Sequence, residues 1–549
     1  MSNTSSGSSL SGSSAETDSA APGDDAIRPT GAAAFLNGCR AAGIELCFAN
    51  PGTTELAIVR AFDASPGWRL VPALFEGVCT GAADGYGRMT GRPALTLTHL
   101  GPGFANGIAN LHNARRARSP IVNLIGDHAA RHLPFDAPLT SDIESLARPV
   151  SAWLHFIGPK DAPADIARQA TIAAGDEGGR IATVVYPADL QADPAPVPKR
   201  ASGSAQASTH SARAIRQSVP GDRVERVARA VNGKRILLLV GGDALSEAGL
   251  RAAQGIADGI GASFFCETFP ARIDRGLAMP APERFPYFPE PAFAAVAAAD
   301  LVVVAGAAAP VTYFAYPDTP SLIAPEEKLL MLASPTEAAT HALQMLARSL
   351  GCRPFEGARP HLQPSTGNAP LSPANAAHAI AAWLPEGAIV SVEGGTCGYP
   401  FFTASAASAS HTVLTNTGGA IGQGLPVAVG ASLAAPDRRV VCVQSDGSAQ
   451  YTVQSLWCMA RENLPVTVLI TANNRYGVLQ NEMRRDGMTK IVGAAAQLTQ
   501  LGDPATDWVA LARGYGVEGR AVSDEAGLRG ALAWAGGRGG PALIEMRIP

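Results

Sequence analysis

Two polar residues, Asp446 and Asn473, follow two apolar β-branched runs in the last part of the chain. The runs cover 440–443 and 466–470, and a helical stretch at about 452–462 separates them. A strand–helix–strand unit of this length is right-handed, so both residues should emerge side by side at the carboxyl ends of parallel strands. A carboxylate and an amide oxygen placed there suit a hard cation such as Mg²⁺, with open positions for phosphate oxygens and water. The alternative is an N-capping Asp and a turn Asn without metal.

A second group with possible chemistry lies in the N-terminal part of the chain. Glu76 comes directly after a predicted strand at 70–74 and opens a Gly/Ala-rich helix. A carboxyl among apolar neighbours is suited to hold or share a proton, although a glutamate that only starts a helix fits the position about as well. His99 follows the next predicted strand, at 94–98. A lone His at a strand end is more often structural than catalytic.

Both groups are embedded in a regular alternation of helices and strands, which is typical of parallel α/β sheets. Stretches rich in Pro, Ser and Ala at 194–221 and 353–371 interrupt the alternation and indicate linkers. We therefore predict three Rossmann-like or flavodoxin-like parallel-sheet domains, at 28–193, 222–352 and 372–549.

The composition of the 549-residue chain fits such a protein and excludes several others. Hydrophobic residues make up 46% and there are 58 Gly and 42 Pro, which suits an α/β protein with many tight turns. The formal net charge is −4 without a long basic run, so no nucleic-acid partner is expected. No apolar run has transmembrane length, and the eight scattered Cys are typical of reduced thiols in a cytoplasmic protein. Residues 1–27 have neither a basic start nor an apolar segment, so we expect a disordered tail there and no signal peptide.

The stretch around Asp446 resembles the diphosphate-binding motif of thiamine-diphosphate (ThDP) enzymes, a family that includes acetolactate synthase and benzoylformate decarboxylase. The family pattern is Gly-Asp-Gly, a helix, then Asn-Asn; Ser445 and Ala472 stand in place of the first Gly and the first Asn. The Mg²⁺ ligands that this resemblance implies are Asp446, Asn473 (with Asn474 as the alternative) and the main-chain carbonyl of Arg475. The other implied cofactor contacts are Gly395, Thr396, Gly419, Ile421, Gly447, Ser448, Tyr476 and Gly477. In the family, the carbonyl at the Gly419 position accepts from N4′ of the cofactor, and the side chain at the Ile421 position bends the cofactor into a V.

The N-terminal part is similar to the same family. The residues that match the family pattern Glu-Gly-x₆-Ala-x-Gly-Tyr-x-Arg are Glu76, Gly77, Ala83, Gly85, Tyr86 and Arg88. This resemblance implies that Glu76 hydrogen-bonds N1′ of the aminopyrimidine and so favours the tautomer whose N4′ removes the thiazolium C2 proton. His99 lies where benzoylformate decarboxylase has an active-site His, and Thr53 where it has an active-site Ser. Acetolactate synthases usually have a small hydroxyl residue at the His99 position.

The resemblance covers the chain from about residue 28 and implies pyrimidine-binding, central and diphosphate-binding domains in that order. FAD, which acetolactate synthases bind in the central domain, is not expected. Their Gly-Met-His-Gly and Gly-Ala-Arg-Phe-Asp-Asp-Arg segments are replaced by 269–272 and 306–310, and the Gly-Gly-Asp turn at 241–243 is weak evidence for any dinucleotide. Pro138-Leu139 replaces a Phe-Gln pair near substrate in the synthases, so the resemblance does not identify pyruvate as the substrate.

The implied function is a ThDP- and Mg²⁺-dependent reaction on a small 2-oxo acid. Our first interpretation is an acetolactate synthase-like carboligase, which decarboxylates the 2-oxo acid and joins the remaining fragment to a second carbonyl. The second is a decarboxylase of the benzoylformate type that releases an aldehyde. The third is a non-catalytic homologue, against which the presence of Glu76, Asp446 and Asn473 is evidence. In the family, the residue at the Glu76 position reaches a cofactor held by another subunit. A homodimer or homotetramer without a membrane partner is therefore expected.

Overall fold

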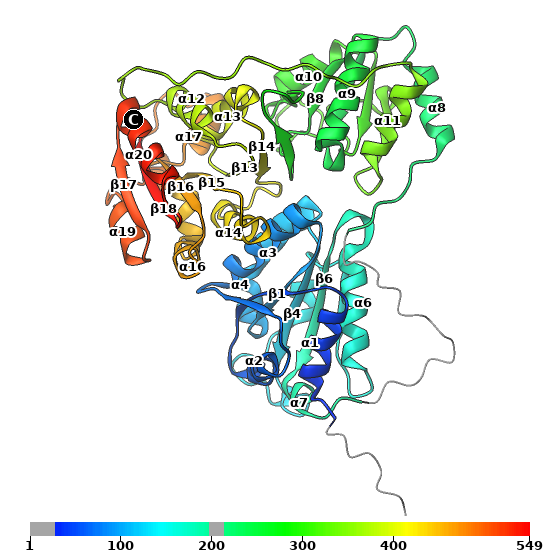
Figure 1. Ribbon diagram of the computed structural model, residues 1–549, viewed down its shortest axis with the longest axis vertical. Coiled ribbons are helices and arrows are strands. Elements are labelled where there is room, and N and C mark those ends of the chain that lie inside the picture. The colour runs from blue at the N-terminus through cyan, green and yellow to red at the C-terminus, as the bar shows by residue number, and fades with distance from the viewer. Residues whose placement is uncertain (1–27, 197–213) are drawn as a thin grey trace, which may run out of the picture.

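The computed structural model describes residues 28–196 and 214–549. The tail expected to be disordered, 1–27, and most of the predicted linker at 194–221 lie outside these residues. The described chain forms three sheets flanked by helices, which confirms the predicted α/β class with parallel sheets. Figure 1 shows the first sheet in the lower half of the molecule, with the middle and last parts of the chain side by side above it. None of the described helices is both long enough and apolar enough to cross a membrane.

The first sheet consists, within the described residues, of six parallel strands in the order β2-β1-β3-β4-β6-β5. The strands are β1 (Leu46–Asn50), β2 (Arg69–Pro72), β3 (Ala94–Thr98), β4 (Ile121–Asp127), β5 (Trp153–Phe156) and β6 (Ile181–Pro187). The helices are α1 (Gly31–Ala41), α2 (Leu56–Asp63), α3 (Glu76–Thr90), α4 (Leu100–Ala117), α5 (Ile143–Ala147), α6 (Pro163–Gly175) and α7 (Ala188–Ala192). Helices α1, α2 and α6 share one hydrophobic cluster, and α3 and α4 contribute to another. The central strands are therefore apolar on both faces, as parallel strands covered by helices must be.

The middle part of the chain forms a parallel sheet that has five strands among the described residues, in the order β10-β8-β7-β11-β12. The strands are β7 (Ile236–Val240), β8 (Ser263–Cys266), β10 (Glu283–Arg284), β11 (Leu301–Ala305) and β12 (Leu329–Ala333). The helices are α8 (Gly221–Ala230), α9 (Glu247–Ile260), α10 (Pro289–Ala297) and α11 (Ala339–Ser349). The segment at 353–371 contains no helix or strand and leads on to the last part of the chain.

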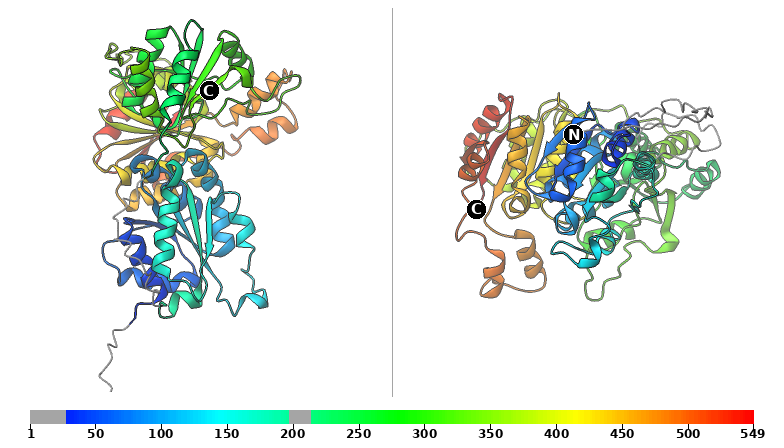
Figure 2. Two further views of the ribbon diagram at one scale, coloured as in Figure 1. Left: turned by 90° about the vertical axis from the view of Figure 1, so that its right-hand side faces the viewer. Right: turned by 90° about the horizontal axis from the view of Figure 1, so that it is seen from below.

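The third sheet has the order β17-β18-β16-β15-β13-β14-β9, and all its pairs are parallel except β14–β9. The strands are β9 (Ile273–Arg275), β13 (Ala388–Val392), β14 (His411–Thr415), β15 (Val440–Ser445), β16 (Val466–Ala472), β17 (Glu518–Val522) and β18 (Ala542–Arg547). The helices are α12 (Pro373–Trp383), α13 (Gly395–Ala404), α14 (Gly424–Ala434), α15 (Asp446–Ala449), α16 (Ser455–Arg461), α17 (Gly477–Arg485), α18 (Ala494–Thr499), α19 (Trp508–Gly514) and α20 (Glu525–Gly536). Strands β13, β15 and β16 are neighbours, so the loops at their carboxyl ends meet. Figure 2 shows α17 and α18 in orange, standing out from the rest of the molecule.

Strand β9 comes from the middle part of the chain but pairs antiparallel with β14 of the third sheet. Arg275 of β9 donates to the carbonyl of Phe402 at 2.7 Å. Just before β9, the carbonyl of Pro270 accepts from the hydroxyl of Thr415 at 2.7 Å. This pairing was not predicted from the sequence, because three residues carry too little periodicity to indicate a strand.

Helices α3 and α14 cross so closely that the contact requires glycine, which has no side chain. A Cβ on Gly430 would overlap the carbonyl oxygen of Ala82, and a Cβ on Gly85 would overlap the carbonyl oxygen of Val427. The two helices therefore touch backbone to backbone, and both contribute to one hydrophobic cluster. Figure 1 shows them together where the first and third parts of the chain meet. Since α3 begins at Glu76 and α14 follows the Gly419 loop, this crossing fixes where two of the predicted site segments lie.

A buried ion pair reinforces the same junction. The guanidinium of Arg88 contacts both carboxylate oxygens of Asp84, from Nε at 2.8 Å and from Nη2 at 2.6 Å. Its Nη1 donates to the carbonyl of Thr415 at 2.7 Å and to that of Ala271 at 3.2 Å. One side chain thus connects α3, the end of β14 and the segment that leads into β9. Desolvation offsets much of the attraction in such a pair, so its main contribution is to orientation.

We predict that Gly430→Ala lowers the melting temperature, because the new methyl group meets backbone that cannot move aside. Overpacking of this kind typically costs about 1–3 kcal/mol. The matched control is Gly530→Ala in α20, where a Cβ has no neighbour within 4 Å. This control should be neutral or slightly stabilising, since Ala is the better helix former by about 1 kcal/mol. Thermal unfolding followed by circular dichroism compares the two variants, and a Gly430→Ala protein as stable as the control would contradict the close crossing.

Candidate functional site

Three loops meet at the carboxyl edge of the third sheet. Asp446 follows β15 and Asn473 follows β16, and these strands pair in register from Val440 to Ser445. The predicted adjacency of the two residues is confirmed by this pairing. Asn473 Nδ2 also donates to the hydroxyl of Thr396 at 3.3 Å. The edge therefore brings together a carboxylate, an amide and a hydroxyl from three different loops.

Asp446 is buried at 5% exposure and forms no ion pair with any described Lys, Arg or His. Its Oδ1 accepts from the N–H of Gly447 at 2.8 Å, and its Oδ2 from the N–H of Asn474 at 2.6 Å. Burial raises the pKa of Asp446 above its usual range, while these two N–H donors oppose the rise. Each oxygen keeps a lone pair, so a cation bound there would offset the cost of burying the charge.

The remaining implied metal ligands are close to Asp446. Asn473 Oδ1 accepts from the N–H of Arg475 at 3.2 Å, which places the Arg475 peptide beside the amide. No group of three or more His, Cys, Asp or Glu suited to a metal occurs among the described residues. The set here contains one carboxylate, one amide and one main-chain carbonyl. Such an oxygen set suits Mg²⁺ that takes its other ligands from phosphate and water.

The backbone around this edge is open to an anion. Helix α13 starts at Gly395, where a Cβ would meet nothing closer than Tyr399 at 3.7 Å and Val478 at 3.8 Å. N–H groups at a helix N-terminus are unpaired and favour phosphate oxygens. Tyr476 packs its ring against Gly447, where a Cβ would lie 2.6 Å from the ring. The hydroxyl of Ser448 donates to Gln444 at 2.8 Å, and Gly477 begins α17.

A glutamate that the sequence analysis missed holds these loops together. Glu393 accepts from the N–H of Gly422, from the N–H of Gly424 and from the amide of Gln444, each at 2.6 Å. Burial raises the pKa of Glu393, and these donors lower it in part. The Gly422 and Gly424 contacts fix the end of the loop with Gly419 and Ile421. Gly419 has a positive φ of 78° and open space beside it, so its backbone is accessible. The only signal in the sequence was the position of Glu393 directly after a strand.

Glu76 belongs to the second group of candidate residues, in the N-terminal part of the chain. It is the first residue of α3, and 7% of it is exposed. Its Oε2 accepts from Asn106 Nδ2 at 3.0 Å. Its Oε1 has no hydrogen-bond donor among the described residues and faces Gly103, where a Cβ would come within 2.8 Å. One carboxylate oxygen is thus held by the protein and the other is left for a ligand. Asn106 and Gly103 were not predicted, because both depend on how α4 packs against α3.

His99 is held by a buried carboxylate that was also not predicted. Glu55 is fully buried, and its Oε2 lies 2.8 Å from His99 Nδ1. Glu55 also accepts from the N–H of Gly52 at 2.7 Å and from the hydroxyl of Thr54 at 2.6 Å. A carboxylate only accepts, so an ionised Glu55 places the ring proton on Nδ1 and leaves Nε2 of His99 for other contacts. A Cβ on Gly126 would overlap the Glu55 carboxylate, so glycine makes room for it.

Thr53 lies in the same turn as Glu55, and among the described residues its side chain forms no hydrogen bond with the His99–Glu55 pair. The turn is a short 3₁₀ segment, Thr53–Glu55, and within it Thr54 approaches His99 Nδ1 at 3.3 Å. The Thr53 side chain is exposed. Among the described residues, no hydrogen bond connects the Glu76 and His99 groups to the Asp446 group. We call these two groups the half-sites of the chain, one with Glu76 and His99 and the other with Asp446 and Asn473.

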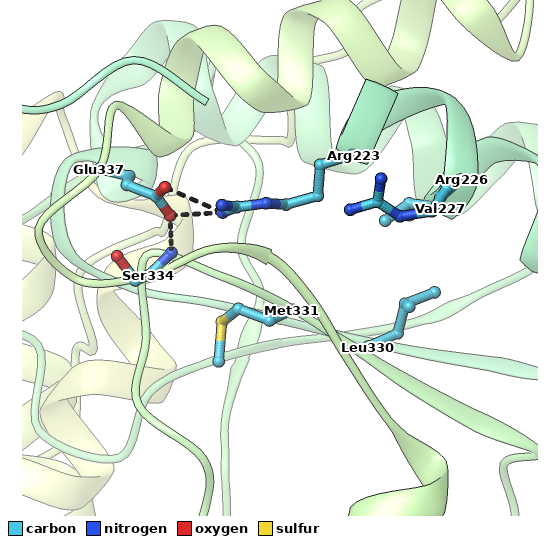
Figure 3. A pocket seen from close by; sticks show the side chains of 7 residues that line it. All are labelled: Arg223, Arg226, Val227, Leu330, Met331, Ser334 and Glu337. Atoms are coloured by element: carbon cyan, nitrogen blue, oxygen red, sulfur yellow. Dashed lines mark hydrogen bonds and ion pairs between the residues drawn. The ribbon is translucent and has the colours of Figure 1, made fainter. Parts of the chain in front are cut away.

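Two depressions are lined mainly by residues outside these half-sites. One of about 820 Å³ adjoins the third-sheet edge at Asn474 and extends to the C-terminal Pro549. Another, of about 460 Å³, lies between α8 and β12 (Figure 3). There, Arg223 contacts both carboxylate oxygens of Glu337, at 2.9 and 2.7 Å. Its charge is already balanced, and none of the predicted site residues lines this depression.

The fold and the two half-sites define a class of protein, a cofactor-dependent α/β enzyme. One of its sheets carries a buried carboxyl. Another sheet carries a helix start that suits an anion, beside a pair of residues that suits a cation. Residues 29–146 match the N-terminal TPP binding domain of thiamine pyrophosphate enzymes, and residues 395–546 match the C-terminal TPP binding domain. The chain belongs to the thiamine pyrophosphate enzyme family, which uses thiamine diphosphate as its cofactor.

Whole-chain similarity supports the same conclusion. A Mycobacterium tuberculosis protein named as acetolactate synthase large subunit-like is 44% identical over 527 residues, covering 94% of this chain and 99% of the relative. The benzoylformate decarboxylase of Pseudomonas aeruginosa is 28% identical over 530 residues, covering 92% and 96% of the two chains. The structure of a thiamine diphosphate-dependent 4-hydroxybenzoylformate decarboxylase from Rhodococcus jostii RHA1 superposes with a TM-score of 0.78 at 24% identity, over 95% and 99% of the chains. This last likeness shows the fold.

Proposed function

We propose that this protein is a ThDP- and Mg²⁺-dependent carboligase of the acetolactate synthase type that acts on 2-oxo acids. The observation that carries the proposal is the 44% identity over nearly the whole length of a synthase large subunit-like relative. A 2-oxo acid decarboxylase that releases an aldehyde is the second candidate, which the His99–Glu55 pair favours because it supplies a positioned proton donor. The eight free thiols fit a reducing, cytoplasmic setting.

The proposed roles combine the family resemblance with the contacts of each half-site. Bound ThDP would supply the carbon nucleophile that adds to the 2-oxo acid and the electron sink for loss of CO₂. The free Oε1 of Glu76 would hold a proton at N1′ of the aminopyrimidine, while Asn106 keeps the carboxyl oriented. Asp446, Asn473 and the Arg475 carbonyl would bind Mg²⁺. Around the diphosphate would lie Gly395, Thr396, Gly447, Ser448, Tyr476 and Gly477. The carbonyl of Gly419 and the side chain of Ile421 would position the aminopyrimidine end.

The middle sheet does not fit FAD. Glu267 follows β8, and its carboxylate accepts from the N–H of Gly242 at 3.0 Å, in the turn where a dinucleotide phosphate would need that donor. A Cβ on Gly241 would lie 2.8 Å from the same carboxyl. Burial raises the pKa of Glu267 to about 7, against the opposing effect of the Gly242 N–H. We therefore propose that the protein works without flavin.

We also propose that the two half-sites are completed by a second copy of the chain. Large apolar side chains close to them in sequence are exposed in the single chain: Leu74, Ile421, Tyr451 and Val478. Monomeric proteins seldom expose such groups together without a partner. The smallest active assembly is then a homodimer, or a homotetramer built from such dimers.

For the metal site, we predict that Asp446→Asn weakens ThDP binding by roughly 100-fold or more, since loss of even indirect ligand support costs 10- to 100-fold. Removal of Mg²⁺ with EDTA should do the same to the unmodified protein, because diphosphate and the Asp446 carboxylate then repel each other. Calorimetric titration with ThDP measures both effects. Asp524→Asn is the matched control, since Asp524 caps α20 at the carboxyl end of β17 and Asn caps equally well. Tight binding in EDTA would overturn the metal assignment.

For the assembly, we predict complementation between two inactive variants. Glu76→Gln and Asp446→Asn chains carrying different tags would be co-expressed and the mixed dimer purified through both tags. If each site takes Glu76 from one chain and Asp446 from the other, one of the two sites in a mixed dimer is intact and about half the activity returns. If both residues act within one chain, every site in the mixture is defective and no activity returns.

His99 separates the two proposed reactions. In a carboligase, the carbon left after loss of CO₂ attacks a second carbonyl, so His99→Ala should leave the joined product within a few-fold. In a decarboxylase that carbon must be protonated, and loss of a positioned donor costs roughly 10²- to 10⁴-fold in aldehyde release. CO₂, aldehyde and hydroxyketone would be measured separately over a panel of 2-oxo acids. His155→Ala is the control, because His155 of β5 pairs with Asp161 in the loop after that strand at 2.8 Å, and strands β4 and β6 separate β5 from β3, which His99 follows. Aldehyde as the sole product of the unmodified enzyme would refute carboligation.

A further inference from the structure

Helix α4 carries three asparagines on one face. Asn106, Asn110 and Asn113 are four and three residues apart, so they form a row along the helix. At one end of the row, Asn106 donates to Glu76 Oε2 at 3.0 Å. At the other end, Asn113 contacts the loop after β14 that contains Gly419. A helix of the first sheet therefore reaches from the Glu76 carboxyl to a loop of the third sheet.

The side chain of Asn113 holds Ala420 through two hydrogen bonds. Its Nδ2 donates to the Ala420 carbonyl at 2.8 Å, and its Oδ1 accepts from the Ala420 N–H at 3.2 Å. Asn416 of the loop also donates to this carbonyl, at 2.9 Å, but the Ala420 N–H has no other acceptor among the described residues. Asn113 is fully buried, and a buried amide that uses both its oxygen and its nitrogen has a fixed orientation.

The N–H that Asn113 holds belongs to the peptide unit between Gly419 and Ala420. A peptide unit is planar, and in its trans form the N–H and the C=O point in opposite directions. This peptide is trans, so the hydrogen bond to Asn113 also sets the direction of the Gly419 carbonyl, away from α4. Gly419 has a positive φ of 78° and open space beside it. Because glycine restricts its own backbone little, the direction of its carbonyl depends on such outside contacts.

Two further contacts hold the loop against α4. The hydroxyl of Thr417 donates to the main-chain carbonyl of Asn113 at 2.8 Å, and His112 Nε2 lies 3.1 Å from the carbonyl of Gly418. A Cβ on Gly418 would overlap the Asn113 side chain. The loop therefore lies directly on the helix, and Asn113 is at the centre of the contact.

We propose that Asn113 is a positioning residue that directs the Gly419 carbonyl toward N4′ of the aminopyrimidine. This inference rests on the proposed function, in which that carbonyl accepts from N4′. Asn113 acts through the Gly419–Ala420 peptide and does not itself contact N4′. Without its amide, the Ala420 N–H loses its acceptor and the carbonyl direction is no longer fixed. The effect is confined to the aminopyrimidine end, because other loops would bind Mg²⁺ and the diphosphate.

Two ligands test this role by binding, without turnover. ThDP carries the 4′-amino group, whereas 4′-deamino-ThDP lacks it and keeps the diphosphate. Asn113→Ala should weaken ThDP binding roughly 3- to 10-fold, as expected for the loss of one hydrogen bond, and leave the affinity for the deamino analogue within about twofold. Calorimetric titration in the presence of Mg²⁺ measures both affinities. A residue that only stabilises the fold would not change their ratio.

A second variant and a control accompany this test. Thr417→Val keeps the shape of the side chain but removes its hydrogen bond to α4, so it should show the same selectivity to a smaller degree even if Asn113→Ala folds poorly. Asn123→Ala is the matched control. Asn123 of β4 is also fully buried, and it accepts from Thr96 at 2.8 Å and donates to Thr183 at 3.4 Å, both within the first sheet. This variant should lower the melting temperature without changing the ratio of the two affinities.

The possible results separate this inference from the proposed function. If Asn113→Ala and Thr417→Val weaken both ligands equally, or weaken neither, Asn113 is a structural residue and the proposal is overturned, while the proposed function stands. If the unmodified protein binds neither ThDP nor its analogue, the proposed function fails and the role of Asn113 fails with it. A selective loss of ThDP affinity in both variants, absent in Asn123→Ala, supports the proposal.

Discussion

The backbone contact between α3 and α14 is the constraint on which the rest of the structure depends. Gly85 and Gly430 let the helices approach until the carbonyls of Val427 and Ala82 occupy the space that side chains would need. Because protein interiors are close-packed, a helix displaced here would carry its whole segment with it. Glu76 and the Gly419 loop are attached directly to these helices. The Arg88–Asp84 pair, which also holds Thr415 and Ala271, adds orientation to this contact.

Three buried carboxylates, those of Glu55, Asp446 and Glu76, differ in the hydrogen-bond donors around them, and the differences fit three tasks. Glu55 accepts from three protein donors and is left with little capacity for a ligand, which suits a group that orients His99. Asp446 accepts from two main-chain N–H groups and keeps lone pairs that suit a cation. Among the described residues, Glu76 accepts from Asn106 alone and leaves one oxygen without a hydrogen-bond donor. The same functional group is thus assigned to support, to ion binding or to proton chemistry by the hydrogen bonds that the fold supplies.

The sequence predicted those features that depend on local pattern. Apolar runs at 440–443 and 466–470 indicated β15 and β16, and the right-handed connection between them implied that Asp446 and Asn473 lie together. Contacts between distant segments could not be obtained in this way. Glu55 is 44 residues from His99, and Glu393 is 51 residues from Gln444, so neither pairing has a periodic signal.

Strand β9 has a consequence for how this protein could exchange parts with its relatives. Its three residues are encoded in the middle part of the chain, yet they cover β14, the strand that would otherwise be the edge of the third sheet. A recombination event that replaced the middle part as a module would remove this cover. The N–H and C=O groups of β14 would then be exposed as a template for pairing with other chains. Productive breakpoints must therefore either leave residues 270–275 in place or bring a replacement that pairs with β14. The middle part of the chain and the third sheet therefore have to be inherited together unless such a replacement is supplied.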